Sequence, residues 1–198
     1  MQILVINSSG RGSVSVSRQL VAVLTDKLTA TQPGAQVVYR DVAAGLPLVN
    51  DLAVSGLYIR DADRTPAQRE SLQLSDTLVA ELQGSDTVVV GMPIYNFGLP
   101  ASLKAYVDLI CRAGLTFSFT ETGPVGLLTP KKVYVVVTSG GTEVGSAYDF
   151  ATPHLRAILG FLGLTDVEFI PADQFMLHGE APVTRAHAAI HELQLELA

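Results

Sequence analysis

The chain has 198 residues, of which 48% are hydrophobic and 16% charged, and its formal net charge at pH 7 is −6. This composition excludes a disordered chain and favours one compact domain over residues 1–198. The absence of a Lys/Arg run argues against nucleic acid and anionic membranes as partners. No apolar stretch approaches the ~18 uninterrupted residues of a membrane span. Because the N-terminus enters a strand without a signal-peptide pattern, and the single cysteine excludes an internal disulfide, we expect a cytoplasmic protein.

A glycine- and serine-rich loop separates the first expected strand from the first expected helix. Residues 2–6 form a short apolar run typical of a central strand, and helical apolar spacing follows the loop. The loop, residues 7–17, places hydroxyl groups before a helix N-terminus, where main-chain N–H groups and the helix dipole favour an anion. Arg11 and Arg18 are present, and the first 24 residues contain no Asp or Glu. The loop therefore predicts a phosphate site; the alternative is a loop that only caps the helix.

The type of phosphate is indicated by the loop's motifs. The P-loop pattern GxxxxGK[ST] is absent. Residues 10–15 come close to GxGxxG, with Ser15 in place of the third glycine, which on its own is weak support for a dinucleotide site. The surplus of hydroxyl groups suits a terminal phosphate monoester, which needs many donors, better than a pyrophosphate approached by bare backbone.

An aromatic turn is expected after a buried strand in the middle of the chain. Residues 35–39 predict the second strand. A long connection follows, which is functional or carries a short helix. A capping box of Thr65 and Gln68 then begins the next helix. Residues 87–91 predict a third, fully buried strand, which runs into a turn with the sequence Tyr95-Asn96-Phe97 and then an amphipathic helix. Flat side chains and an amide at a strand end suit a flat heterocycle with polar edges. The alternative is a hydrophobic turn that caps a helix.

The second half of the chain continues the alternation of strands and helices. Residues 114–128 have no clear period and predict an ordered loop or a short excursion. Strands are expected at 133–137 and 167–170, and helices at 152–163 and 182–197. The fourth strand ends in a small-residue loop, Thr138-Ser139-Gly140-Gly141.

This alternation predicts an α/β fold with a five-stranded parallel sheet, strand order 2-1-3-4-5, and helices on both faces. Right-handed crossovers place the carboxyl ends of all strands at one edge. The loops at 7–17, 93–98 and 138–141 then lie together, which favours one ligand with a phosphate at the first loop and a ring near the other two. Because a sheet of this kind binds flavin mononucleotide (FMN) where its strand order reverses, FMN is the expected cofactor.

Other reactive side chains are interpreted as structural. His187 and His191 are four residues apart on the last helix, but no third ligand stands nearby, so no metal site is expected. Asp108 and Arg112 are expected to form an ordinary i,i+4 helix pair. Cys111 lies in an amphipathic helix and is interpreted as a small core residue. Because no GxSxG motif or Ser/His/acid set occurs, no catalytic side chain is expected.

A set of short motifs covers essentially the whole chain and is densest from residue 93 to residue 127. It consists of Pro93-Ile94-Tyr95-Asn96-Phe97, Leu103-Lys104, Tyr106, Asp108-Leu109, Arg112-Ala113-Gly114, Thr116-Phe117, Thr120-Glu121, Gly123-Pro124, Gly126-Leu127, Lys131-Lys132, Gly140-Gly141, Thr152-Pro153 and Leu159-Gly160-Phe161. In these residues the chain resembles the bacterial FMN-dependent NADH azoreductases of flavodoxin-like fold, also called FMN-dependent NADH:quinone oxidoreductases.

The resemblance implies where FMN would bind in a single flavodoxin-like domain. In such enzymes serines of the first loop and helix hold the FMN phosphate, the turn after the third strand carries the isoalloxazine ring, and the loop after the fourth strand reaches the ring's other polar edge. The matching positions are Ser9, Ser15, Val16, Ser17, Ile94, Tyr95, Asn96, Phe97, Thr138, Ser139, Gly140 and Gly141. The family works as homodimers with the flavin near the interface, which agrees with the low charge of this chain for its apolar content.

The chain departs from the family's pattern in three places. Gly10-Arg11-Gly12 is richer in glycine than the family's phosphate loop, Phe119 corresponds to a frequent tyrosine, and a short segment after Gly141 carries Glu143. We interpret Phe119 and Phe161 as lining the space where nicotinamide and acceptor stack; the alternative is that both belong to the core.

The activity expected from the resemblance is transfer of two electrons, as hydride, from NADH through FMN to quinones and to aromatic azo compounds. The flavin carries the chemistry, and one place over it serves donor and acceptor in succession, which predicts a ping-pong mechanism. Two alternatives stay open: a one-electron carrier of the flavodoxin type, and an NAD-binding Rossmann enzyme built on the GxGxxG near match. A bound yellow chromophore separates the flavoproteins from the latter, and NADH oxidation by a quinone separates the reductase from the carrier.

Overall fold

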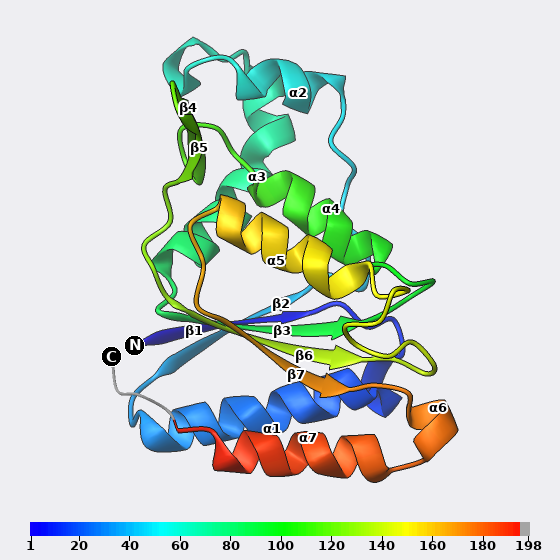
Figure 1. Cartoon of the computed structure of the whole chain (residues 1–198). Helices are drawn as coiled ribbons and strands as arrows, with labels where there is room; N and C mark the ends of the chain where they lie inside the picture. Colours follow the sequence, from blue (N-terminus) through cyan, green and yellow to red (C-terminus); the bar gives the residue numbers. More distant parts are fainter. Residues whose placement is uncertain (195–198) are drawn as a thin grey trace.

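A parallel sheet covered by helices on both faces organises the molecule, as the computed structural model of the chain shows for residues 1–194 (Figure 1). In these residues the sheet has five strands: β1 (Gln2–Asn7), β2 (Gln36–Asp41), β3 (Thr87–Pro93), β6 (Lys132–Thr138) and β7 (Val167–Ala172). Their order is β2-β1-β3-β6-β7, and every neighbouring pair is parallel. This is the predicted order 2-1-3-4-5 when only the strands of this sheet are counted.

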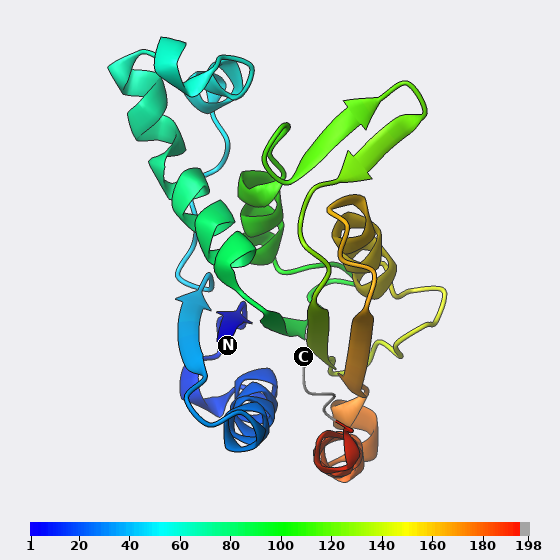
Figure 2. The ribbon, with the colours of Figure 1, turned by 90° about the vertical axis from the view of Figure 1, so that its left-hand side faces the viewer.

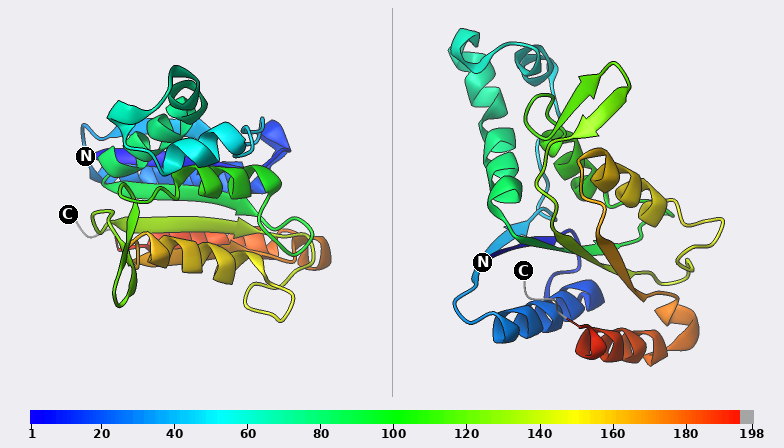
Figure 3. Two further views of the ribbon diagram at one scale, coloured as in Figure 1. Left: turned by 90° about the horizontal axis from the view of Figure 1, so that it is seen from above. Right: turned by 60° about the vertical axis from the view of Figure 1, so that its left-hand side comes forward.

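Helices lie on both faces of the sheet (Figures 1 and 3). One face is covered by α1 (Val16–Thr31) and α7 (Ala181–Glu192), and the other by α3 (Pro66–Gly84), α4 (Ala101–Ile110) and α5 (Ala151–Phe161). Each helix layer closes an apolar cluster against the sheet, one containing Val5, Val89 and Val136, the other Leu4, Val90 and Val135. Because both faces are covered, the inner strands are continuous apolar runs rather than alternating ones.

The long connection after β2 contains a short helix, one of the two alternatives that the sequence left open. This helix, α2 (Asp51–Leu57), is capped by the Asn50 side chain, which accepts the N–H of Ala53, and a 3-10 turn (Asp61–Asp63) follows. The predicted capping box at the start of α3 is confirmed: Thr65 Oγ1 accepts the N–H of Gln68 at 3.3 Å, and Gln68 Oε1 accepts the N–H of Thr65 at 2.9 Å.

Residues 114–128 form an antiparallel hairpin of β4 (Phe117–Thr120) and β5 (Gly123–Gly126), which projects away from the main sheet (Figure 2). The sequence indicated only an excursion, because two four-residue strands are too short to show a period. The hairpin is anchored where its second strand meets the end of α5. There the N–H of Leu128 donates to the carbonyl of Leu162 at 3.2 Å, and Gly126 packs against Gly163.

Two elements differ from the expectation at the end of the chain. A short helix, α6 (Phe175–His178), precedes α7 and was not predicted. The last helix was expected to reach residue 197, but α7 ends at Glu192, because Lys27 Nζ donates to the carbonyls of His191 and Leu193 at 2.6 and 2.8 Å and the chain turns there. Residues 195–197 of that prediction lie outside the described residues. Among residues 1–194 no helix has the length and apolar character needed to span a membrane.

Candidate cofactor site

The loops after β1, β3 and β6 meet at the carboxyl edge of the sheet, as the topology predicts. A cavity of about 70 Å³ opens between them. Its lining residues are Ser9, Arg11, Ser15, Val16, Pro93, Ile94, Tyr95, Thr138, Ser139, Gly140 and Phe175. Three stretches that are far apart in the sequence therefore share one site.

Most of the residues predicted to bind the cofactor line this cavity, and four do not. Ser17 lies directly behind the lining, with its Oγ 3.1 Å from the Oγ of Ser15. Asn96 and Phe97 continue the turn that Tyr95 begins, and Gly141 follows Gly140 in the loop after β6. These four belong to the same three loops.

Buried serines surround the N-terminus of α1. Ser15 is the N-cap residue of α1, and its Oγ accepts the N–H of Arg18 at 3.4 Å. Ser9, Ser15 and Ser17 are all at most 2% exposed, and Ser9 Oγ accepts the N–H of Arg11 at 3.3 Å. The first turn of this 16-residue helix contains no acidic residue. Hydroxyl groups, main-chain donors and the helix dipole thus converge where an anion would bind.

The two arginines of the first loop have different environments. The guanidinium of Arg18 donates to the carbonyl of Ser9 at 2.8 and 3.2 Å and forms an ion pair with Asp41 at 2.8 Å. The hydrogen bond from Arg18 lowers the pKa of the Asp41 carboxyl. Arg18 therefore holds the main chain at Ser9, and its charge is already balanced by Asp41. Arg11 lines the cavity and is the cation available to an anionic ligand there.

The turn after β3 is strained. Tyr95 and Gly98 exchange main-chain hydrogen bonds of 3.1 and 3.0 Å, and the two central residues, Asn96 and Phe97, have φ angles of 48° and 69°. Two consecutive positive φ angles define a type I′ turn, in which glycine usually follows asparagine. A phenylalanine in this conformation costs roughly 1–3 kcal/mol, so the surroundings must hold it. One such restraint is the N–H of Phe150, which donates to the carbonyl of Phe97 at 3.0 Å.

The loop after β6 is held in place by the segment that leads into α6. The N–H of Gln174 donates to Ser139 Oγ at 3.1 Å, and the N–H of Met176 donates to the carbonyl of Gly140 at 3.0 Å. A Cβ atom at Gly140 would lie 2.7 Å from the sulfur of the exposed Met176, so a larger residue here would make the Met176 side chain shift. This packing also brings Phe175 into the cavity lining.

Three lining residues were not predicted: Arg11, Pro93 and Phe175. The charge of the first loop, which includes Arg11, was a usable signal, and Pro93 directly precedes the predicted ring-binding segment. Phe175 had no signal, because it enters the site from an unpredicted helix that follows a different strand.

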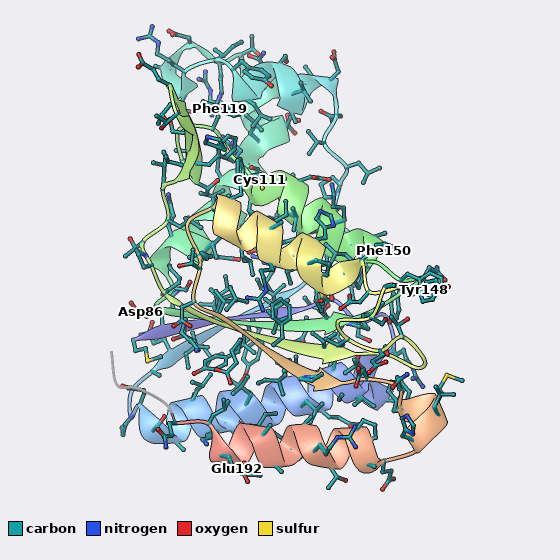
Figure 4. The ribbon with its side chains drawn as sticks, in the orientation of Figure 1. Asp86, Cys111, Phe119, Tyr148, Phe150 and Glu192 are labelled. Carbon is teal, nitrogen blue, oxygen red and sulfur yellow. The ribbon has the colours of Figure 1, made fainter. Side chains whose placement is uncertain are left out.

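Exposed aromatic rings lie beside the strained turn. Phe97, Tyr148 and Phe150 are 50%, 66% and 60% exposed, and the rings of Phe97 and Tyr148 have centroids 5.8 Å apart. Figure 4 shows Tyr148 and Phe150 at the carboxyl edge of the sheet, on the loop between β6 and α5. Neighbouring exposed rings at this edge of the sheet are suited to contact a flat ligand.

The two residues predicted for the substrate pocket lie elsewhere in the chain. Phe119, 72% exposed, is on the hairpin, well separated from Tyr148 and Phe150 (Figure 4). Its ring packs edge-on against the ring of Phe117, with the two centroids 5.4 Å apart. The ring of the half-buried Phe161 also packs against Phe117, at a centroid distance of 4.4 Å. The structure does not bring either residue to the cavity within one chain, so their role in a pocket depends on a second copy.

A larger cavity, of about 840 Å³, lies at the opposite edge of the sheet, where Figure 4 shows Asp86. Its buried cation, Lys131, is already bonded to the carbonyls of Leu82 and Gln83 at 2.8 and 3.3 Å and to that of Ser85. Open α/β sheets bind ligands at their carboxyl edge, and none of the three special loops reaches this side. The cavity between the loops is therefore the candidate site, and its donors fit a ligand with a phosphate at one end and a flat ring at the other.

The fold and this cleft define a flavodoxin-like protein. Residues 1–195 match the family described as Flavodoxin-like fold. The chain is 50% identical over 189 residues to "FMN-dependent NADH:quinone oxidoreductase 1" of Hahella chejuensis, covering 96% of this chain and 93% of that one. It is 51% identical over 191 residues to "FMN-dependent NADH:quinone oxidoreductase" of Thiobacillus denitrificans, covering 96% and 92%. The chain belongs to this family of FMN-dependent NADH:quinone oxidoreductases, which confirms the resemblance seen in its motifs.

Solved structures show the same fold. An azoreductase from Bacillus anthracis superposes with a TM-score of 0.85 at 24% identity, covering 98% of this chain and all 100% of that one. An FMN-dependent NADH-azoreductase from Bacillus anthracis in complex with FMN gives a TM-score of 0.86 at 22% identity, covering 96% of each chain.

Proposed function

We propose that this protein is an FMN-dependent oxidoreductase that transfers two electrons, as hydride, from NADH to quinones and to aromatic azo compounds. The observation that carries the proposal is the meeting of buried serines at a helix N-terminus and a strained aromatic turn at the carboxyl edge of a flavodoxin-like sheet. Relatives about half identical to the chain are named for FMN, NADH and quinone, and solved neighbours are named azoreductases.

The chain's own residues would hold the two ends of FMN. Ser9, Ser15 and Ser17, with the N-terminus of α1 and the charge of Arg11, would hold the phosphate. The turn at residues 94–97 and the loop at 138–141 would hold the ring. A single phosphate-sized loop, without a second site for a pyrophosphate, supports FMN rather than FAD.

FMN, when bound, supplies the hydride-transfer chemistry. Among the described residues that line the cavity, Arg11 and Tyr95 are the titratable ones, and no carboxylate or histidine is present. The protein is therefore expected to bind and orient its ligands rather than to move a proton itself. Main-chain N–H groups of residues 138–141 would stabilise negative charge at the ring edge, as preorganised donors do in other enzymes.

We also propose that the protein works as a homodimer. Large apolar side chains are exposed in and after α2 (Leu52, Val54 and Tyr58) and on or beside the hairpin (Phe119, Val125 and Leu127). Both elements stand away from the sheet (Figures 1 and 2), where such residues are typical of a protein interface. The NADH in the relatives' names and the single cysteine support a reducing compartment such as the cytoplasm.

The test begins with the purified protein. We expect a yellow chromophore that is identified as FMN after extraction, and NADH oxidation that requires a quinone, followed by decolorisation of an azo dye. Extraction of FAD would contradict the cofactor proposal. A bound flavin without quinone-dependent NADH oxidation would instead favour a one-electron carrier.

A further inference from the structure

Asp149 is a buried carboxylate between two exposed aromatic residues. Asp149 is 4% exposed, whereas its neighbours Tyr148 and Phe150 are among the most exposed aromatic residues of the part of the chain that the structure describes. The carboxylate accepts N–H groups of Gly145 at 2.9 Å and of Ala151 and Thr152 at 3.0 Å each, and also the hydroxyl of Thr152. It is therefore fully bonded to its own surroundings.

These hydrogen bonds join two separate parts of the chain. Oδ1 accepts the N–H groups of Ala151 and Thr152 in the first turn of α5. Oδ2 accepts the hydroxyl of Thr152 and also the N–H of Gly145, in the middle of the loop that precedes α5. A capping residue needs only the first set. The bond to Gly145 closes the loop on itself and leaves residues 146–150 with little freedom to move relative to α5.

The closed loop in turn reaches the strained turn. The N–H of Phe150, one residue after Asp149, donates to the carbonyl of Phe97 at 3.0 Å. The ring of Phe97 meets that of Tyr148, one residue before Asp149, at 5.8 Å. Each neighbour of Asp149 thus contacts the residue whose positive φ angle needs support.

We propose that Asp149 is a positioning residue that fixes the exposed aromatic rings beside the turn at residues 95–98. By closing the loop at Gly145, its carboxylate places the N–H of Phe150 on the Phe97 carbonyl and holds the ring of Tyr148 beside that of Phe97, where a flat acceptor can contact these rings. This inference rests on the proposed function, because these rings are assigned to the acceptor. The role proposed for Asp149 differs from that of a plain helix cap because it depends on the hydrogen bond from Gly145.

Two substitutions separate the two roles. Asp149→Ala removes every bond of the carboxylate. Asp149→Ser keeps a short hydroxyl that caps α5 at Thr152, as serine does at N-caps, but it has no second oxygen for Gly145. Thr65→Ala is the matched control, because it removes the cap of α3, far from the cleft. Each variant is loaded with FMN and compared with the wild type in Tm, quinone KM and kcat, and amide hydrogen exchange at Phe150 by NMR.

We expect both Asp149 variants to exchange the Phe150 amide about tenfold faster or more and to raise quinone KM by a similar factor, the size of one lost buried hydrogen bond. The kcat at saturating quinone should change much less, and Thr65→Ala should lower Tm without either effect. Wild-type behaviour of Asp149→Ser, in exchange or in KM, would overturn the proposal and leave Asp149 as a cap. A rise in KM that follows Tm in all three variants would also overturn it. If the wild-type protein reduces no quinone, the proposed function fails, and the exchange rates still decide whether Asp149 positions Phe150.

Discussion

Ser15 and Ser17 are almost completely buried, although hydroxyl side chains in the first turn of a helix usually face water. Their Oγ atoms bond to each other at 3.1 Å, which leaves further hydrogen-bonding capacity at the helix N-terminus. We therefore expect single side chains to decide how tightly an anion binds at this helix N-terminus.

Replacing Ser17 by alanine should weaken FMN binding. Loss of a donor to a charged group costs about 1.5–3 kcal/mol, which corresponds to roughly ten- to a hundredfold in affinity. FMN titration followed by flavin fluorescence measures this, and kcat at saturating FMN should change little. Ser13→Ala is the control, because Ser13 is exposed in the same loop and outside the cavity lining. Unchanged FMN affinity in Ser17→Ala would show that the first loop is not the phosphate site.

The stability contributed by Asp149 should depend on pH. Burial raises the pKa of the Asp149 carboxyl, but hydrogen bonds from Thr152, Gly145 and Ala151 outweigh burial and lower it overall. Because the folded pKa lies below the unfolded value of about 3.9, the stabilisation is present above that pH and is lost as the pH falls through the folded pKa. The Tm difference between wild type and Asp149→Asn should be constant near neutral pH and shrink below about pH 4. A difference that stays constant to lower pH would contradict this.

At the scale of elements, the hairpin is held by contact between two glycines. A Cβ atom at Gly126 would lie 2.1 Å from the backbone nitrogen of Gly163, so a side chain there forces the hairpin away from the end of α5. We expect Gly126→Ala to destabilise the fold by about 1–3 kcal/mol or more, measured by chemical unfolding. Gly160→Ala is the control: nothing lies within 4 Å of its Cβ position in α5, and alanine is the better helix former. Equal stability of the two variants would mean that the hairpin is not anchored at Gly126.

At the scale of the whole molecule, one cleft is expected to serve two substrates. The three loops form a single candidate site at the carboxyl edge, so NADH and the acceptor are expected to bind one after the other. Steady-state rates with both substrates varied should give parallel double-reciprocal lines. Intersecting lines would show that both bind together and that the ping-pong proposal is wrong.

The role of Phe119 depends on whether two copies of the molecule assemble. Its ring is exposed and far from the cleft of its own chain, so it can line a pocket only in a dimer. We expect sedimentation to show a dimer at micromolar concentration, and Phe119→Ala to retain FMN while shifting quinone KM or the ranking of quinones over azo compounds. Phe161→Ala is the comparison: because Phe161 packs on Phe117 at 4.4 Å, it should lose stability, by at most the ~3–5 kcal/mol of a buried phenylalanine. An active, FMN-loaded monomer, or a Phe119→Ala variant in which both quinone KM and acceptor ranking are unchanged, would refute the pocket role.

The sequence by itself determined the layout of the sheet and the place of the candidate site. Buried parallel strands are apolar runs, and helices show a 3.6-residue period, so the alternation from Gln2 to Ile170 could be predicted from local patterns. The capping box at Thr65 and Gln68 was visible because its residues are neighbours. Once the order of strands was set, handedness alone placed the three loops at one edge.

Only the tertiary structure decided which side chains complete the site. Phe175 lines the cavity from the segment after β7, and Phe150, just before α5, supports the turn at Phe97. Their positions depend on hydrogen bonds to Ser139 and Phe97 that no local pattern encodes. The position of Phe119 depends on a hairpin too short to show a period, packed through Gly126. Hydrophobic period and capping act over a few residues, whereas these placements arise from packing between segments distant in the chain, and that packing exists only in the folded molecule.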